Sequence, residues 1–464
     1  MSAIYEYNLL KNLIIKLKSF EYLNYILGSL FLLAVVSPSL GLMFGTSSMA
    51  EGLAIVIVLC LITVLYMYSL NTITIYLQPT FNVLAIILVS ILAHGLINYS
   101  FHGEQFNLTR FLLSFIYLIF VVVGAFSFVL IMRKANIKKC NFIFNFLFIS
   151  FVLIALLSAI GFSPFQIGGK SIVFYSEPSH YALDFLPLLL FTVIQANQKN
   201  KVIYLVVAFE IALVLQSLTL MVGVILVSII ALRVWSTLIT LGLFIMLYYT
   251  APLVHDLFSF VNSSSEIVMY RENDNSYIIS RLPITAGPVL GSVNGSFLVY
   301  FSGWERAFLN FLDYFGFGVG FQQLGFIGNW GDAMERLVDV YYKPMGLFDG
   351  GAVAPKLVSE FGVFALVCMG CYTTLLFKTI KNLRLISLSS FSDIDIRNVF
   401  FMCYFVMYAI NLFIRAPGYF SMSSFLFISS IFWISLSNNQ VFRSSESDYA
   451  LKNNPGRLFC RARG

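Results

Sequence analysis

The segment of this sequence with the clearest chemical potential is Phe-Tyr-Ser-Glu-Pro-Ser-His-Tyr-Ala, residues 174–182. Glu177 and His180 are three residues apart, and Pro178 suits the first turn of a helix, so both side chains can face the same side. Either could accept the proton of an attacking hydroxyl while the other orients it. An equally weighted interpretation is local: Ser176 or Glu177 caps the helix, and the acid complements the helix dipole. Glu177 and His180 are therefore candidate catalytic residues.

A second set of side chains suits an anionic substrate. Arginine binds phosphate oxygens in bidentate fashion and stays charged at physiological pH. In a transfer from a phosphorylated donor, negative charge grows on the leaving phosphate, and fixed guanidinium groups stabilise it. For any single arginine, the alternative is contact with water or lipid headgroups. The candidate pyrophosphate ligands are Arg271, Arg281, Arg306 and Arg415.

The sequence predicts no metal site and no cofactor. The four histidines lack ligand spacing and have no accompanying carboxylate cluster. A phosphate-cradling G-x-x-x-x-G-K-[ST] segment is absent as well.

The elements that must position these residues are apolar. Hydrophobic residues make up 59% of the chain and charged residues 11%, against roughly 25% charge in soluble domains. Many apolar runs approach the ~20 residues that a helix needs to cross a bilayer. Because the runs lack period-2 alternation, they predict an all-α, polytopic transmembrane helix bundle rather than a barrel. The expected spans, about twelve, are 21–43, 51–70, 80–98, 110–132, 141–160, 180–196, 202–216, 218–232, 235–252, 355–377, 398–414 and 422–437.

The basic residues predict the orientation. Most of the 28 lysines and arginines fall in connections on one side, which the positive-inside rule makes cytoplasmic. Both termini are then cytoplasmic, and the first run is expected to be an uncleaved anchor. The net charge of +6 mostly reflects this bias and indicates no nucleic-acid partner. The seventh and eighth runs are short and can form a tight hairpin through Gln216 and Ser217.

The predicted organisation has four parts: an N-terminal bundle of about nine helices (1–252), a large periplasmic loop (253–354), C-terminal transmembrane helices (355–437) and a cytoplasmic tail (438–464). The loop is rich in apolar residues and carries helix signals. Residues 302–305 match an S-x-x-E capping box, and Asp332 opens a second helix. We expect both amphipathic helices to lie along the membrane surface or to cap the bundle, with Arg306 and Arg336 on their polar faces.

Three segments together indicate a family. Residues 174–182 resemble the E-P segment of O-antigen polymerases (the Wzy family). Ser-Gly-Trp-Glu-Arg at 302–306, leading to Gly-Val-Gly-Phe at 318–321, resembles the arginine-then-G-V-G pattern of O-antigen polymerases and ligases. Lys-Leu-Val-Ser-Glu-Phe-Gly at 356–362 is similar to their E-x-G segment. By position, Arg306 matches the outer-loop arginine and Glu177 matches the E-P acid.

The resemblance implies a GT-C-like, metal-independent glycosyltransferase of lipopolysaccharide biosynthesis in the bacterial inner membrane. Such an enzyme moves a growing glycan from undecaprenyl pyrophosphate onto a new lipid-linked repeat unit at the periplasmic face. Its implied partners are undecaprenyl-pyrophosphate-linked oligosaccharide, membrane lipid and a chain-length regulator protein.

Two alternatives stay open. O-antigen ligases typically carry a histidine just before the E-x-G segment, and residues 349–355 contain none, which favours a polymerase. A lipid-linked oligosaccharide flippase would also have about twelve helices. Transporters, however, usually show internal repeats and ionisable residues near the bilayer midplane. This chain has few of either.

Overall fold

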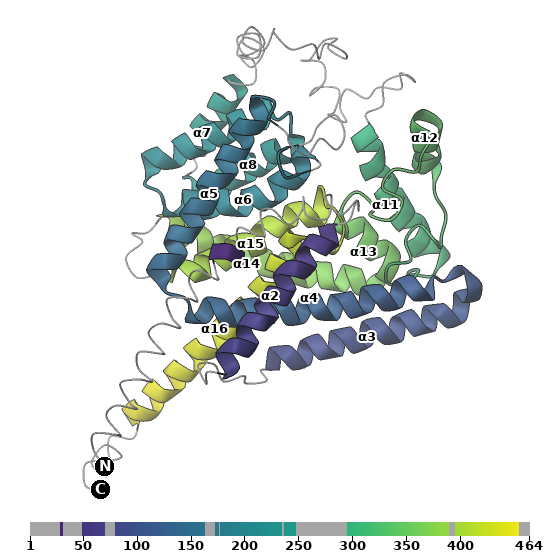
Figure 1. The fold of residues 1–464 in the computed structure, drawn as a ribbon, viewed down its shortest axis with the longest axis horizontal. Coiled ribbons are helices and arrows are strands. Elements are labelled where there is room, and N and C mark those ends of the chain that lie inside the picture. The colour runs from purple at the N-terminus through teal and green to yellow at the C-terminus, as the bar shows by residue number, and fades with distance from the viewer. Residues whose placement is uncertain are drawn as a thin grey trace.

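The computed structural model describes residues 28–30, 49–69, 79–162, 172–175, 177–233, 236–246, 295–388 and 395–453. In these ranges the chain is helical apart from turns, loops and two isolated β-bridges. The helices (Figure 1) are α2 (Met49–Ser69), α3 (Pro79–His102), η1 (Gly103–Gln105), α4 (Leu108–Lys134), α5 (Ile137–Ala159), α6 (Pro178–Gln195), α7 (Gln198–Val214), α8 (Leu218–Ala231), an unlabelled helix at Ser236–Met246, α11 (Gly295–Asp313), α12 (Asp332–Tyr341), α13 (Val353–Phe361), α14 (Val363–Leu388), α15 (Ile396–Phe413) and α16 (Met422–Asn453).

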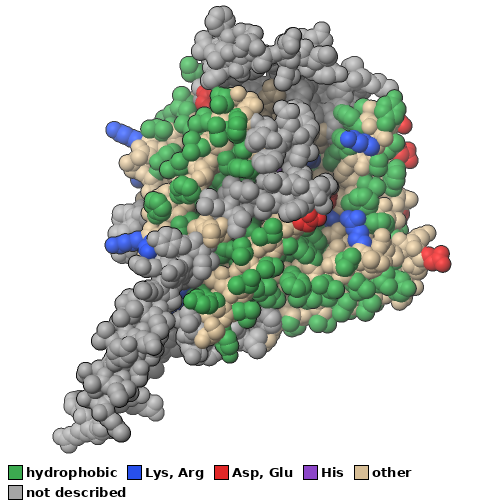
Figure 2. Space-filling model, in the orientation of Figure 1, with side chains coloured by type: hydrophobic (Ala, Val, Ile, Leu, Met, Phe, Trp, Pro, Cys, Tyr) green, Lys and Arg blue, Asp and Glu red, His purple; other side chains and the backbone are tan. Residues whose placement is uncertain are grey.

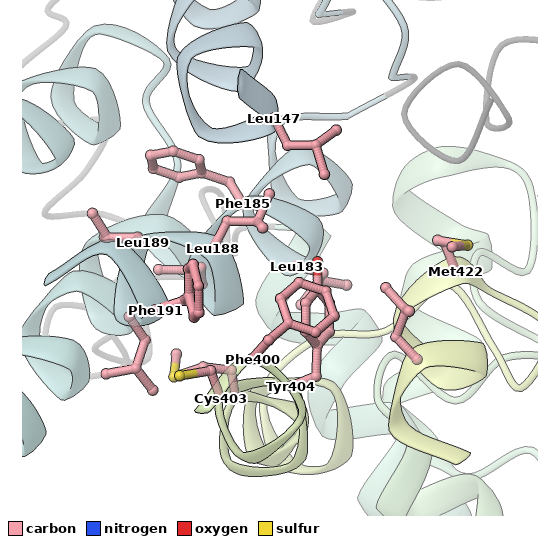
Figure 3. Packing of buried hydrophobic residues seen from close by; sticks show 14 of the residues in the cluster. Leu147, Leu183, Phe185, Leu188, Leu189, Phe191, Phe400, Cys403, Tyr404 and Met422 are labelled. Atoms are coloured by element: carbon pink, nitrogen blue, oxygen red, sulfur yellow. The ribbon is translucent and has the colours of Figure 1, made fainter. Parts of the chain in front are cut away.

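Helices α6 and α15 form the centre of the bundle. Helix α15 packs against α5, α6, α13, α14 and α16, and both central helices are buried along most of their length. Aromatic rings fill the contact: Phe400 stacks on Phe144 with centroids 4.1 Å apart and meets Phe191 edge-on at 5.9 Å. Figure 3 shows Phe191, Phe400 and Cys403 converging from these helices. Offset and edge-on pairs of this kind add to the stabilisation from burial.

The outer helices turn apolar side chains outward. On α5 the exposed residues follow helical spacing, Phe142, Phe146, Ile149, Leu153 and Leu156. Figure 2 shows hydrophobic side chains over much of the visible face, including the edge formed by α3 and α4. Six helices in the described ranges, α2, α3, α4, α5, α14 and α15, are long and apolar enough to cross a membrane. The all-α prediction is therefore confirmed, with an exterior suited to hydrocarbon.

Four predicted spans need comment. The run at 355–377 is not one helix: it divides into α13 and α14 at Gly362, whose φ of +55° ends the first helix. The hairpin between α7 and α8 turns at Gln216 and Ser217, as expected. Helix α8 has 14 residues and rises only ~21 Å, less than a bilayer core of ~30 Å. The predicted span 21–43 lies outside the described residues, except for 28–30.

One end of the bundle is closed by basic side chains. Arg397 donates to the carbonyls of Met132, Arg133 and Ala135 at the end of α4. Lys201 donates to the carbonyl and hydroxyl of Ser387 near the end of α14. These cations satisfy helix C-termini and complement their dipoles. The candidate site described below lies at the other end of α4 and α15.

Helix α11 corrects the prediction for the 253–354 segment. It begins at Gly295, so residues 302–305 lie inside the helix and form no capping box. Glu305 instead accepts the N–H groups of Asp332 and Ala333, which caps α12. Arg306 lies on the polar face of α11, as predicted, but the protein covers that face: Arg306 is 1% exposed, whereas Phe308 on the apolar face is 63% exposed. Helix α12 begins at Asp332, as predicted.

The Gly-Val-Gly segment packs directly on the end of α13. Val319 N–H donates to Ser359 O, and Gly320 N–H donates to Glu360 O, at 3.0 and 2.9 Å. Gly318 has φ of +82°, and a Cβ there would lie 2.6 Å from the Glu360 carbonyl. Only glycine fits this approach.

We expect Gly318→Ala to lower the Tm of the purified protein by roughly 5 °C or more, because it combines a backbone clash with a left-handed φ. Gly370→Ala on α14 is the matched control, since a Cβ there meets nothing within 4 Å. Thermal unfolding in detergent measures both. Equal Tm values for the two variants would contradict the close approach.

Candidate functional site

Glu177 precedes α6 and takes part in an ion pair rather than a helix cap. Its Oε2 accepts a hydrogen bond from Arg415 Nη2 at 2.8 Å and one from Ser179 Oγ at 2.9 Å. Although Glu177 occupies the N-cap position, its side chain accepts no N–H of the first turn. The interpretation of Glu177 as a side-chain cap is therefore wrong. Ser176, the other predicted cap, lies outside the described residues. Glu177, Ser179, His180 and Arg415 are called the Glu177 cluster below.

The charges around Glu177 decide its protonation. Burial acts to raise the pKa of Glu177, but Arg415, followed by His180, outweighs burial and lowers the pKa to about 2. The carboxylate is therefore ionised at neutral pH and is a weak proton acceptor. His180, in the first turn of α6, lies within electrostatic range of Glu177, Arg415 and Asp349.

A second cluster lies between α11 and α13 and is called the α11–α13 polar centre: Arg306, Lys356 and Glu360. Arg306 Nη2 donates to Leu347 O at 2.6 Å, and Lys356 Nζ donates to Phe348 O at 2.6 Å. Lys356 and Glu360 are one helical turn apart, with Nζ 4.0 Å from Oε1. All three side chains are at most 2% exposed.

Burial and neighbouring groups set the charges in this centre. Burial lowers the pKa of Arg306 to about 10, against the opposing effect of Glu360, so the guanidinium stays protonated. Burial raises the pKa of Glu360; Lys356, the backbone N–H groups of Gln322 and Leu324, and the Tyr419 hydroxyl all act to lower it. The Tyr419 hydroxyl donates to Glu360 Oε2 at 2.9 Å.

The Gln323 side chain holds the start of α4 close to the α11–α13 polar centre. Gln323 accepts the N–H of Asn107 at 2.8 Å and donates to its carbonyl at 3.2 Å, just before α4 begins. One turn on, the Arg110 guanidinium lies 4.6 Å from the Phe348 ring centre and 5.0 Å from that of Phe326. Such cation–π contacts hold the charge without neutralising it.

The 346–351 loop joins the two clusters. It supplies the carbonyls bound by Arg306 and Lys356, and its Gly351 carbonyl accepts the Ala416 N–H next to Arg415 at 3.1 Å. Asp349 in the loop also packs against Gly418, three residues after Arg415: a Cβ added to Gly418 would lie 3.1 Å from Asp349 Oδ1. Cationic side chains from four separate parts of the chain therefore surround one loop: Arg110, Arg306, Lys356 and Arg415.

The predicted site residues divide as follows. Glu177, His180 and Arg415 come together, and Arg306 lies in the polar centre on the other side of the loop. Arg271 and Arg281 lie outside the described residues. The sequence prediction missed Lys356, Glu360 and Arg110 as members of the site. The Lys–Glu pair, four residues apart within the E-x-G segment, was the available signal for two of them.

The contacts of His94 are those of a hydrogen-bonded residue that packs in the core. Its Nε2 lies 2.9 Å from Phe317 O, and its ring is packed by Phe317 and Phe361. In the described part of the chain, no group of three or more histidine, cysteine, aspartate or glutamate residues could hold a metal ion.

Comparisons with protein-family models, curated proteins and solved structures found no match to this chain. The chemistry of the site therefore rests on its geometry. Fixed cations beside an ionised acid and a histidine can bind a phosphorylated leaving group and accept a proton.

Proposed function

We propose that this protein is a metal-independent membrane glycosyltransferase with about twelve crossings that polymerises lipid-linked repeat units, as an O-antigen polymerase does. One observation carries the proposal: Arg110, Arg306, Lys356 and Arg415 surround the 346–351 loop beside Glu177 and His180. Arg415 and Lys356 each have an acidic partner, whereas Arg110 and Arg306 form no ion pair among the described residues. Buried or partly buried cations are costly unless they serve an anion. A lipid pyrophosphate is an anion that reaches such a site from the bilayer.

The proposed reaction is a displacement at the anomeric carbon. The acceptor hydroxyl oxygen forms a bond to that carbon, the bond from carbon to the pyrophosphate oxygen breaks, and undecaprenyl pyrophosphate leaves with the electron pair. Arginine and lysine side chains stabilise the charge on this leaving group. His180 accepts the hydroxyl proton, and Glu177 holds Arg415 in place, because a carboxylate with a pKa of about 2 is a poor base.

The proposal requires the site to face the periplasm, with both termini in the cytoplasm. The basic end formed by Arg397 and Lys201 then faces the cytoplasm, in accord with the positive-inside rule. A periplasm-dependent reporter fused after Asn294 should be active, and one fused after Lys381 should be inactive. The opposite pattern would overturn the orientation and with it the proposed reaction.

Lipopolysaccharide from a deletion strain tests the function. A polymerase mutant keeps a single repeat unit on the lipid core, whereas a ligase or flippase mutant keeps none. Purified protein should then extend the lipid-linked repeat unit extracted from that strain, without added nucleotide sugar. Loss of all repeat units from the core in the deletion strain would exclude a polymerase.

A further inference from the structure

Ser302, Arg306 and Asn310 lie on successive turns of α11 and form a buried polar row. Each is at most 1% exposed. Each also carries an atom without a hydrogen-bond partner in the described part of the chain: Ser302 Oγ, Arg306 Nη1 and Asn310 Oδ1. Glu360 Oε1 is a fourth such atom, on the facing helix α13.

This concentration is unusual for a structural feature. Seven buried side-chain atoms in the described residues lack a hydrogen bond, and four of them lie at this one helix contact. A buried unpaired polar atom destabilises a fold, so native proteins keep few of them. Several unpaired atoms at one helix contact therefore point to a ligand that supplies the missing partners.

The types of atom identify the class of ligand. Arg306 Nη1 can only donate, Asn310 Oδ1 and the Glu360 carboxylate accept, and the Ser302 hydroxyl can do both. A phosphate has acceptor oxygens only at neutral pH, so it cannot pair with Asn310 Oδ1 or an ionised Glu360. Sugar hydroxyl groups both donate and accept, so they can pair with each of these four atoms.

The 346–351 loop covers the Ser302 and Arg306 end of this row, whereas Asn310 Oδ1 faces Gly328, where an added Cβ would lie 2.1 Å from it. The Gly350 carbonyl packs on Gly303, where an added Cβ would lie 1.9 Å away, and Leu347 O holds Arg306. Gly346 and Gly350 have φ of +72° and +67°. Glycine moves between such left-handed conformations and ordinary ones at little cost, so the loop has two points about which it can lift.

We propose that the polar row binds a sugar ring of the lipid-linked repeat unit, admitted when the 346–351 loop lifts, while the cations around the loop hold the pyrophosphate. This inference rests on the proposed function and adds a place for the uncharged part of the substrate. The row and the pyrophosphate ligands share Arg306, whose Nη1 and Nη2 then serve different groups.

Ser302→Ala tests the proposal because it removes an unpaired hydroxyl and almost no volume. We expect the KM for the lipid-linked repeat unit extracted from the deletion strain to rise about three- to tenfold, the loss of one hydrogen bond. The Tm should stay equal or rise, since the empty protein no longer buries an unpaired hydroxyl. A structural role predicts the reverse, a lower Tm with an unchanged KM.

Thr192→Val is the matched control: Thr192 Oγ1 is also buried and unpaired among the described residues, but it lies in the last turn of α6. Its KM should be that of the wild type. An unchanged KM for Ser302→Ala, or a rise equal to that of Thr192→Val, would overturn the proposal. Absence of polymerisation by the wild-type protein would count against the proposed function. Direct binding of the extracted repeat unit to the wild-type protein and to Ser302→Ala then decides the row, and equal affinities would overturn it.

Discussion

Replacing Arg306 by Met should reduce the rate of polymer formation at least ~100-fold, the usual effect of removing one fixed donor to a developing charge. Methionine keeps much of the aliphatic volume of a side chain that is 1% exposed, so the helix contact should survive. Arg306→Lys should recover only part of the rate, because one ammonium group cannot reproduce the two-nitrogen fork. Ladder length in a complemented deletion strain and initial rates with extracted substrate measure the effect.

The matched control is Arg336→Met on α12, an exposed arginine in the same 253–354 segment. It should leave both ladder and rate unchanged. Membrane levels and Tm of each variant must be compared, since loss of the Arg306 bond to Leu347 O also loosens the 346–351 loop. Normal ladders from Arg306→Met at matched expression would remove this arginine from the proposed site.

The second large effect is expected at His180. If its imidazole accepts the proton of the acceptor hydroxyl, His180→Ala should lower the rate by ~10²–10⁴-fold. Glu177→Gln should lower it less, by roughly tenfold, because glutamine can still accept a hydrogen bond from Arg415 but loses the charge that holds it. Single-turnover rates with extracted lipid-linked repeat unit distinguish the two.

A double-mutant cycle identifies the role of Glu177. Glu177 and Arg415 form one ion pair, so the effects of Glu177→Gln and Arg415→Ala should be far from additive. If Glu177→Gln alone costs as much as His180→Ala, the carboxylate is the base and the assignment above is wrong. Full-length ladders from both Glu177→Gln and His180→Ala would exclude the Glu177 cluster from the chemistry.

The helices of the bundle could be predicted because the surrounding hydrocarbon constrains them directly. A run such as that of α4 must satisfy its backbone hydrogen bonds internally, so its length and composition predict a helix without reference to its neighbours. The start of α6 at Pro178 and the spacing of Glu177 and His180 are local in the same sense. The start of α12 at Asp332 followed from a charge pattern within one turn.

The site itself depended on contacts between distant residues. Glu177 and Arg415 are 238 positions apart, and Arg306 and the Leu347 carbonyl are 41 apart. No local pattern predicts which of several outer arginines meets a given acid. The sequence prediction also missed the division of one apolar run into α13 and α14 at Gly362, although Lys356 and Glu360 precede the break and residues 363–377 after it are uncharged.

The orientation of α11 shows the physical limit most clearly. Its sequence predicts one apolar and one polar face, and this much the helical period determines. The structure buries the polar face, with Arg306 and Asn310, and exposes Phe308 on the apolar face. Periodicity alone does not say which of the two faces the rest of the protein covers. Only the tertiary packing of α11 on α13 decided it, and that packing placed Arg306 in a candidate site instead of on the surface.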